Sequence, residues 1–247
     1  KTGEDLADYG LNNITIGDET ISETDLIRRK WLNNDFYGMV FSYNNKVGKF
    51  DYTLGGAYNI YEGQHYGEIV WAQYASNSSI YQRYYDNDAN KEDLNYFGKV
   101  NYSAGKINLF ADLQKRMIDY SYIGKDDDGT DLEDASTFDF LNPKIGMFVQ
   151  FDKKKSFYIS HAVANREPNR SDFVDSSPAS RPTHETLNDT EVGYKFQTKG
   201  LTFGATGYYM KYNNQLILTG QINDVGAFTR ENIKNSYRAG IELEGAL

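Results

Sequence analysis

Long segments of this 247-residue chain alternate between apolar and polar residues, and no other feature restricts its fold as much. In the segment 50–60, every second residue is aromatic, aliphatic or glycine, and the residues between them are polar or small. The same period recurs in 94–102, 142–151 and 237–244. Successive side chains of a β-strand point to opposite faces of a sheet. The alternation therefore predicts β-strands that each have one apolar and one polar face.

The predicted strands are unusually long. We expect nine of them, at 34–45, 49–61, 93–103, 106–122, 138–151, 155–165, 187–198, 201–218 and 232–245. A tenth is a candidate within 11–30, where Ile14, Ile16, Ile21 and Leu26 are less regularly spaced. Strands of ordinary globular domains have about five or six residues, whereas a tilted strand that crosses a bilayer needs about ten. The lengths therefore favour strands that span a membrane.

The connections between these strands alternate in length. Tight turns rich in Lys, Gly, Asn and Asp occupy 44–49, 103–106, 152–155 and 198–200. Long polar links lie between them, at about 62–92, 123–137, 166–186 and 219–231. Short turns on one side and long loops on the other are the organisation of outer-membrane barrels. The sequence thus predicts an all-β fold, an antiparallel transmembrane β-barrel segment.

Aromatic residues support the barrel over a soluble β-sandwich. The chain has 21 Tyr and 14 Phe, and tyrosines gather near predicted strand ends, for example at Tyr58 and Tyr120. Membrane barrels carry aromatic girdles there. A sandwich also alternates, because it buries one face and wets the other, but it rarely loads its strand ends with aromatics. Several glycines at polar-face positions fit a crowded interior or a bend; they are Gly55, Gly146, Gly193 and Gly240.

The composition excludes several classes of protein. Without cysteine, the chain has neither a disulfide nor a thiolate zinc site. A net charge of -9 with scattered Lys and Arg argues against nucleic acid as a partner. No apolar run is long enough for a membrane-spanning helix, and any export signal has been removed or lies upstream. Neither a phosphate-binding glycine loop nor a nucleophile elbow is present, so we expect no enzyme activity and no cofactor.

A set of sequence strings resembles the barrel domain of TonB-dependent receptors, particularly the Bacteroidetes type. The strings follow one another in order over nearly the whole chain, at 28–38, 55–72, 112–116, 140–146, 164–170, 185–194, 208–216 and 235–244. The more specific ones are Asn142-Pro143-Lys144, followed by Gly146, and Arg166-Glu167-Pro168, which begins a long loop. The closing strand 235–244 supports them.

This resemblance implies an outer-membrane receptor of a Gram-negative bacterium. Such a receptor binds a scarce nutrient, such as an iron–siderophore, haem, cobalamin or a glycan, and admits it when TonB pulls on a plug domain. The partners implied are TonB, the receptor's own plug domain, outer-membrane lipid and the small-molecule nutrient. Because the family closes with about 22 strands, the residues 1–247 are expected to be an internal part of the barrel, without the plug and the C-terminal strands.

Candidate ligand-binding residues cluster in the predicted link 62–92. They are His65, Tyr66, Trp71, Tyr74, Tyr84 and Tyr85. Clustered aromatics and one imidazole on an external loop could hold a siderophore, a haem or the edge of a glycan. The alternative is a loop that packs on itself with an aromatic collar at the membrane interface. Three scattered histidines, His65, His161 and His184, do not predict a metal site.

Two further segments each have a functional and a plain interpretation. Arg166 and Arg170, where a strand meets a long loop, could hold an anionic ligand, or they could form a local ion network with Glu167. The acidic segment 124–131 is similar to a calcium loop, but Ala135 stands where an EF-hand has its glutamate. This segment is either a solvated acidic loop or a weak calcium site of another type.

Two rival functions also stay open at the sequence level. The first is a soluble or surface-attached β-sandwich that binds carbohydrate. The second is a β-rich glycosidase, although scattered Asp and Glu residues do not by themselves indicate the required pair of carboxylates.

Overall fold

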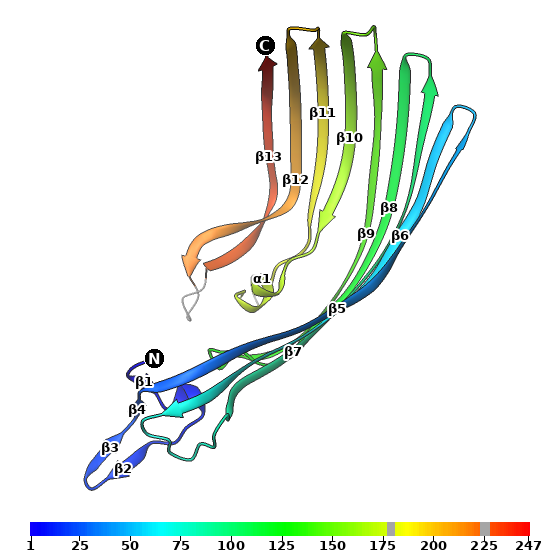
Figure 1. The fold of residues 1–247 in the computed structure, drawn as a ribbon. Coiled ribbons are helices and arrows are strands. Elements are labelled where there is room, and N and C mark those ends of the chain that lie inside the picture. Colours follow the sequence, from blue (N-terminus) through cyan, green and yellow to red (C-terminus); the bar gives the residue numbers. More distant parts are fainter. Residues whose placement is uncertain (177–180, 223–227) are drawn as a thin grey trace. The chain divides into compact units, whose positions relative to one another are not determined.

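The described chain is almost entirely β-structure (Figure 1). The computed structural model describes residues 1–176, 181–222 and 228–247. One nine-stranded sheet contains, in sequence order, β5 (Leu26–Val47), β6 (Phe50–Ala72), β7 (Arg83–Ala104), β8 (Ile107–Lys125), β9 (Asp131–Gln150), β10 (Lys155–Arg166), β11 (Glu185–Gln197), β12 (Thr202–Ile222) and β13 (Phe228–Ala246). Neighbours in this sheet are consecutive in sequence, and β5 and β13 are its two edge strands. No helix within the described ranges is long and apolar enough to cross a membrane.

All nine predicted strands of the main sheet are confirmed, but most are longer than the alternation indicated. β6 continues to Ala72 and β7 begins at Arg83, so the expected link 62–92 shrinks to residues 73–82. The link 123–137 likewise shrinks to 126–130. In these extensions both faces carry polar residues, and the apolar period therefore disappears although the backbone ladder continues. Alternation reports what the side chains contact, whereas strand length depends on backbone pairing.

The candidate tenth strand within 11–30 is not a strand of the main sheet. This segment forms β2 (Ile14–Ile16) paired with β3 (Glu19–Ile21), while β1 (Glu4–Asp5) pairs with β4 (Glu23–Thr24). Together with the 3-10 turn η1 (Ala7–Tyr9), these short elements cover a small core. The core residues are Leu6, Tyr9, Leu11, Leu26 and Ile69. Ile14, Ile16 and Ile21 thus belong to a local hairpin.

The chain divides into two compact units, and the strands β5 to β9 contribute residues to both. Unit 1 comprises Lys1–Gly38, Asn59–Asp93 and Ile118–Thr137, and unit 2 comprises Met39–Tyr58, Leu94–Met117 and Phe138–Leu247. Unit 1 holds the N-terminal elements and the long β6–β7 hairpin end. Unit 2 holds the four tight turns and the whole of β10 to β13.

The register of unit 2 aligns apolar side chains in rows that run across the strands. Ile159 of β10 is opposite Met147 of β9 and Val192 of β11, and Val192 is opposite Gly207 of β12, which is opposite Ile241 of β13. We call this side the apolar face. It has no cover among the described residues, since Ile145 is 58% and Ile241 77% exposed. A sandwich would bury these side chains under a second sheet.

On the other side, which we call the polar face, four glycines lie beneath aromatic rings of neighbouring strands. A Cβ atom added to any of them would come within 3.0 Å of the ring. The pairs are Gly55 with Phe97, Gly146 with Phe110, Gly193 with Tyr158 and Gly240 with Tyr208. These are the four glycines that the sequence assigned to a crowded interior, and the aromatic rings are what crowds it. Each ring fills the space that the missing side chain leaves open.

Candidate functional site

Residues of three strands form a partly exposed aromatic stack in unit 1. Trp31 of β5 stacks with Tyr66 of β6 at a centroid distance of 6.1 Å and an interplanar angle of 21°. The guanidinium of Arg83, at the start of β7, lies 3.7 Å from the Tyr66 ring centroid. Trp31 Nε1 donates a hydrogen bond to Glu68 Oε2 at 2.8 Å. We call Trp31, Tyr66 and Arg83 the aromatic stack.

Arg83 also forms an ion pair with Asp86 on its own strand. Its guanidinium donates to Asp86 Oδ2 at 2.5 Å, and this hydrogen bond is the main cause of a raised pKa of Arg83. A permanently charged guanidinium over a tyrosine ring is a cation–π contact. The stack therefore combines flat aromatic surface with a guanidinium that is paired with Asp86, an arrangement that suits a planar small molecule.

Tyr84 and Tyr85 serve mainly in packing. The Tyr84 ring lies 4.8 Å from that of Tyr9 and 5.0 Å from that of Tyr85, centroid to centroid. Arg28 donates to both the Tyr84 hydroxyl, at 3.4 Å, and the Tyr9 hydroxyl, at 3.2 Å. Burial raises the pKa of Tyr84, and Tyr85 is only 6% exposed. These contacts agree with the alternative of a segment that packs on itself.

His65, Trp71 and Tyr74 do not join the aromatic stack. His65 Nε2 lies 3.2 Å from Asn34 Oδ1, and Trp71 is 51% exposed near the end of β6. Tyr74 lies in the connection 73–82, where its backbone N–H donates to Thr24 Oγ1 at 2.9 Å. Because His65 and Tyr66 are consecutive in one strand, their side chains point to opposite faces. The six predicted residues therefore do not line a single site.

Arg166 and its neighbours form an ion network in unit 2. Arg166 Nε lies 3.1 Å from Glu185 Oε1. The guanidinium of Arg116 donates to both carboxylate oxygens of Glu167, at 2.9 and 3.1 Å. Arg170 is the first residue of the short helix α1 (Arg170–Val174). Arg166 therefore pairs with Glu185, while Glu167, which the plain interpretation of this segment grouped with Arg166 and Arg170, pairs with Arg116.

Helix α1 is attached to the last strand of the chain. Asn169 caps it, because its side chain accepts from the Asp172 backbone N–H while the Asp172 carboxylate accepts from the Asn169 N–H. The same carboxylate, which is almost fully buried, accepts a hydrogen bond from Arg230 at 2.8 Å. The connection between β10 and β11 is thus joined to β8 through Glu167 and to β13 through Asp172.

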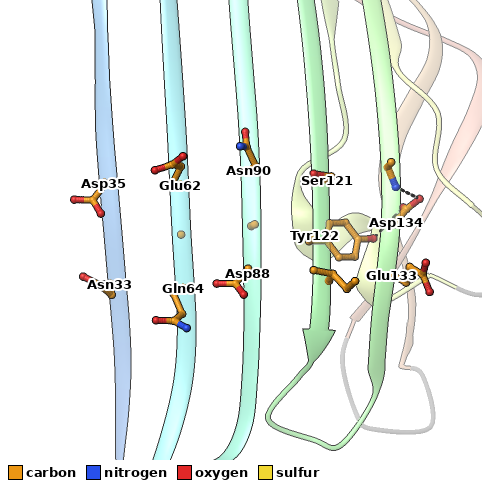
Figure 2. A pocket seen from close by; sticks show the side chains of 14 residues that line it. Asn33, Asp35, Glu62, Gln64, Asp88, Asn90, Ser121, Tyr122, Glu133 and Asp134 are labelled. Atoms are coloured by element: carbon orange, nitrogen blue, oxygen red, sulfur yellow. Dashed lines mark hydrogen bonds between the residues drawn. The ribbon is translucent and has the colours of Figure 1, made fainter.

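A groove of about 870 Å³ crosses the β5–β9 ends of unit 1 (Figure 2). Its lining residues are Asn33, Asp35, Glu62, Gly63, Gln64, Asp88, Ala89, Asn90, Ser121, Tyr122, Ile123, Glu133, Asp134 and Ala135. They include five carboxylates and neither Lys nor Arg, and we call it the acidic groove. Figure 2 shows Asp35, Glu62 and Asp88 on neighbouring strands. Tyr122 donates to Asp134 Oδ2 at 3.0 Å.

The acidic groove continues the alternation of the apolar face. Asp35 lies two residues before Tyr37 in β5, and Glu62 lies two residues after Ile60 in β6. Residues two apart in a strand share a face. Within unit 1, the face that carries Tyr37 in β5 and Ile60 in β6 therefore becomes acidic two residues further along each of these two strands. Sequence analysis missed this groove, because its residues come from five strands and most of them lie within 62–92 and 123–137, which were expected to be links.

The acidic segment 124–131 forms a tight connection between β8 and β9. The Asp128 carboxylate accepts from the Thr130 backbone N–H at 2.9 Å, and Lys30 forms an ion pair with Asp127. Backbone bonds between Asp126 and Thr130 close the turn. Within the described residues, no group of three or more His, Asp or Glu side chains is arranged to hold a metal ion.

Comparisons with known proteins place this architecture in a family. Solved structures with a similar fold include the copper transporter OprC (TM-score 0.71, 13% identity, 88% of this chain and 35% of that chain). The FrpB iron transporter of Neisseria meningitidis is also similar (0.61, 15%, 93% and 35%). So is the ferric yersiniabactin uptake receptor FyuA of Yersinia pestis (0.59, 12%, 90% and 33%).

The chain spans about a third of the length of these three structures. No curated protein sequence matches it significantly. The family described as TonB dependent receptor-like, beta-barrel, matches residues 3–247. The chain therefore belongs to the TonB-dependent receptor β-barrel family.

Proposed function

We propose that this chain forms part of the wall of an outer-membrane receptor that takes up a scarce nutrient with energy supplied through TonB. Its chemistry is binding and passage, and no covalent bond of the nutrient is broken. The full receptor would contain a plug domain, which contacts the polar face. Family membership supports this function, and the uncovered apolar face is the single observation that carries the membrane location.

The dimensions of the apolar face support a bilayer location. On β9 its side chains extend from Val149, near the turn, to Leu141. With Phe151, just beyond the strand, this is ten residue steps at about 3.3 Å each, and a tilt of about 40° reduces the height to about 25 Å. That value is close to the apolar band of outer-membrane barrels, which is about 25 Å tall. A sandwich has no need for an uncovered band of this height.

We further propose that the nutrient is a small metal chelate, and that the aromatic stack is the part of this chain that contacts it. The similar solved structures transport copper and iron compounds, which supports a metal-containing nutrient. Aromatic and cationic side chains hold such complexes whole, so a protein metal site is not required. Among the residues expected from sequence, Tyr66 belongs to this surface, while Trp31 and Arg83 are additions from the structure.

A growth experiment tests this function. A strain that lacks the full-length receptor is supplied with single sources of iron–siderophore, haem, copper, cobalamin or glycan. We expect impaired growth on one metal source, and rescue by the wild-type receptor but not by a Trp31→Ala, Tyr66→Ala double variant. A Tyr81→Ala, Ile80→Ala variant, also exposed in unit 1, is the matched control. A defect on the glycan alone would contradict the metal-chelate proposal and support the carbohydrate alternative.

A further inference from the structure

The turn end of unit 2 has an unusual concentration of lysines. Each of the four tight turns carries at least one lysine in the turn or directly beside it. They are Lys46, Lys49, Lys106, Lys153, Lys154, Lys155 and Lys199, and all are exposed. The same segments, 46–51, 104–107, 151–155 and 198–201, contain two acidic residues, Asp51 and Asp152. The turn end is therefore strongly positive, although the whole chain has a net charge of -9.

These lysines are not used by the fold of the described chain. None of them forms an ion pair with a carboxylate at salt-bridge distance among the described residues. Lys106 Nζ donates to the backbone carbonyl of Phe151 at 2.5 Å. Asp152 is engaged in its own turn, where its Oδ1 accepts from the backbone N–H groups of Lys154 and Lys155 at 2.7 and 3.0 Å. These bonds, led by the one from Lys154, lower the pKa of Asp152. The ammonium groups therefore remain available to an external anion.

Each turn also presents exposed apolar side chains next to its lysines. Val47 is 60%, Phe50 50%, Ile107 40%, Phe151 47% and Leu201 41% exposed. They mark the end of the apolar face, so the ammonium groups lie at its border. A lysine at such a border lays its aliphatic stem along apolar surface and extends its charge into the polar zone. At the edge of a lipid bilayer, that zone contains headgroup phosphates.

We propose that the turn lysines bind the phosphates of anionic phospholipid in the leaflet that borders the turns. This inference rests on the proposed membrane function and adds a specific lipid partner to it. The occupant is phospholipid because the lysines continue the apolar face, which a soluble anion or an acidic protein would not require. The acidic groove of unit 1, by contrast, has five carboxylates and no cation to attract a phosphate. Lipid phosphate is therefore expected at the turns and not at the groove.

Lipid selectivity of the full-length receptor tests the proposal. The receptor is reconstituted into phosphatidylcholine vesicles that contain a small share of spin-labelled phosphatidylglycerol or spin-labelled phosphatidylcholine. The fraction of label that is motionally restricted reports which lipid lies against the protein. We expect phosphatidylglycerol to be enriched about two-fold or more, and the enrichment to decrease with salt because the ammonium–phosphate attraction is screened.

Two variants with the same change in charge separate the turns from the rest of the protein. The turn variant combines Lys49→Gln, Lys106→Gln, Lys154→Gln and Lys199→Gln, one in each turn. The control combines Lys99→Gln, Lys144→Gln, Lys195→Gln and Lys234→Gln, which lie on the polar face of β7, β9, β11 and β13. The turn variant is expected to bind both lipids equally, while the control keeps the wild-type enrichment.

The possible failures are distinguishable. Equal enrichment in the wild type and the turn variant, or an equal loss in both variants, overturns the lipid proposal while the membrane function stands. Loss of the enrichment on adding inorganic phosphate, at an ionic strength where sodium chloride has no effect, would indicate a site for free phosphate and also overturn it. A receptor that never inserts into vesicles contradicts the proposed function itself. Folding of each variant is checked by its heat-dependent shift on a denaturing gel.

Discussion

Adding one methyl group at Gly193 tests whether the aromatic rings hold the polar face together. Gly193 is buried on β11, and the Tyr158 ring of β10 occupies the place of its missing Cβ. In Gly193→Ala the ring must move, and the Tyr158 hydroxyl then loses its contacts with Glu191 and Thr206, both at 3.4 Å. Overpacking of this kind costs about 1–3 kcal/mol. Both hydrogen bonds are long, so their loss adds little to this cost in free energy.

Gly207 supplies the matched control. It lies on β12, one strand from Gly193, but on the apolar face, where an added Cβ meets nothing within 4 Å. Gly207→Ala has no clash and restricts the unfolded chain, which stabilises by about 0.4–1 kcal/mol. Because the restriction of the unfolded chain is common to both variants, they are expected to differ by the overpacking cost alone, about 1–3 kcal/mol in the free energy of unfolding, with Gly193→Ala the less stable.

The assay is urea unfolding of the full-length receptor in detergent micelles, followed by tryptophan fluorescence. A double-mutant cycle with Tyr158→Ala isolates the contact, because removing the ring should make Gly193→Ala nearly harmless. If Gly193→Ala costs the same with and without the Tyr158 ring, the ring does not crowd this glycine. The reasoning would then also be refuted for the pairs at Gly55, Gly146 and Gly240.

Three further predictions concern other parts of the chain. Ile145→Arg puts a charge on the apolar face and should destabilise the membrane-inserted receptor by about 2–4 kcal/mol. Lys144→Arg on the polar face should change its stability little. If unfolding assays give the two variants the same stability, the assignment of the faces is wrong. Asp172→Ala removes the carboxylate that pairs with Arg230 and caps α1, and about 1–3 kcal/mol of local stability is lost, since the Arg230 guanidinium is partly exposed to water. Limited proteolysis should then cut between β10 and β11, while unchanged protection would show that the pair does not hold α1. Burial raises the pKa of Tyr84. The stability that the neutral Tyr84 contributes is therefore complete below the unfolded pKa of about 10 and is lost as pH rises through the higher folded pKa. Tyr84→Phe should remove this alkaline transition from the hydrogen exchange of unit 1, and a transition that persists in the variant would belong to another group.

The alternation of side chains predicted the main sheet because most of its strands meet a different environment on each face. Nine strands and four turns followed from that rule, together with the two faces of segments such as 142–151. The ends of β6 and β7 could not be predicted in this way. Beyond Ile60 the regular apolar period is lost, as Glu62 and His65 illustrate, although Ile69 further along the strand is buried.

The candidate site was less predictable, because it depends on the register between strands. His65 and Tyr66 are adjacent in sequence but point to opposite faces, whereas Trp31 and Arg83 are distant in sequence and meet at Tyr66. Arg166 is opposite Glu185 in the β10–β11 ladder. The two residues are joined by 18 residues of connecting chain. The register between β10 and β11 cannot be deduced from the sequence of a connection this long.

The continuation of β6 and β7 beyond the apolar face affects how this part of the molecule can change. Ala72 lies ten residue steps beyond Glu62, which corresponds to about 33 Å of extended strand. Each backbone amide in such a ladder is hydrogen-bonded to a neighbouring strand. An insertion in the middle of this region would therefore break backbone hydrogen bonds. New ligand preferences are therefore expected to arise through exchanged side chains at fixed positions of the ladder, while changes in length are confined to residues 73–82.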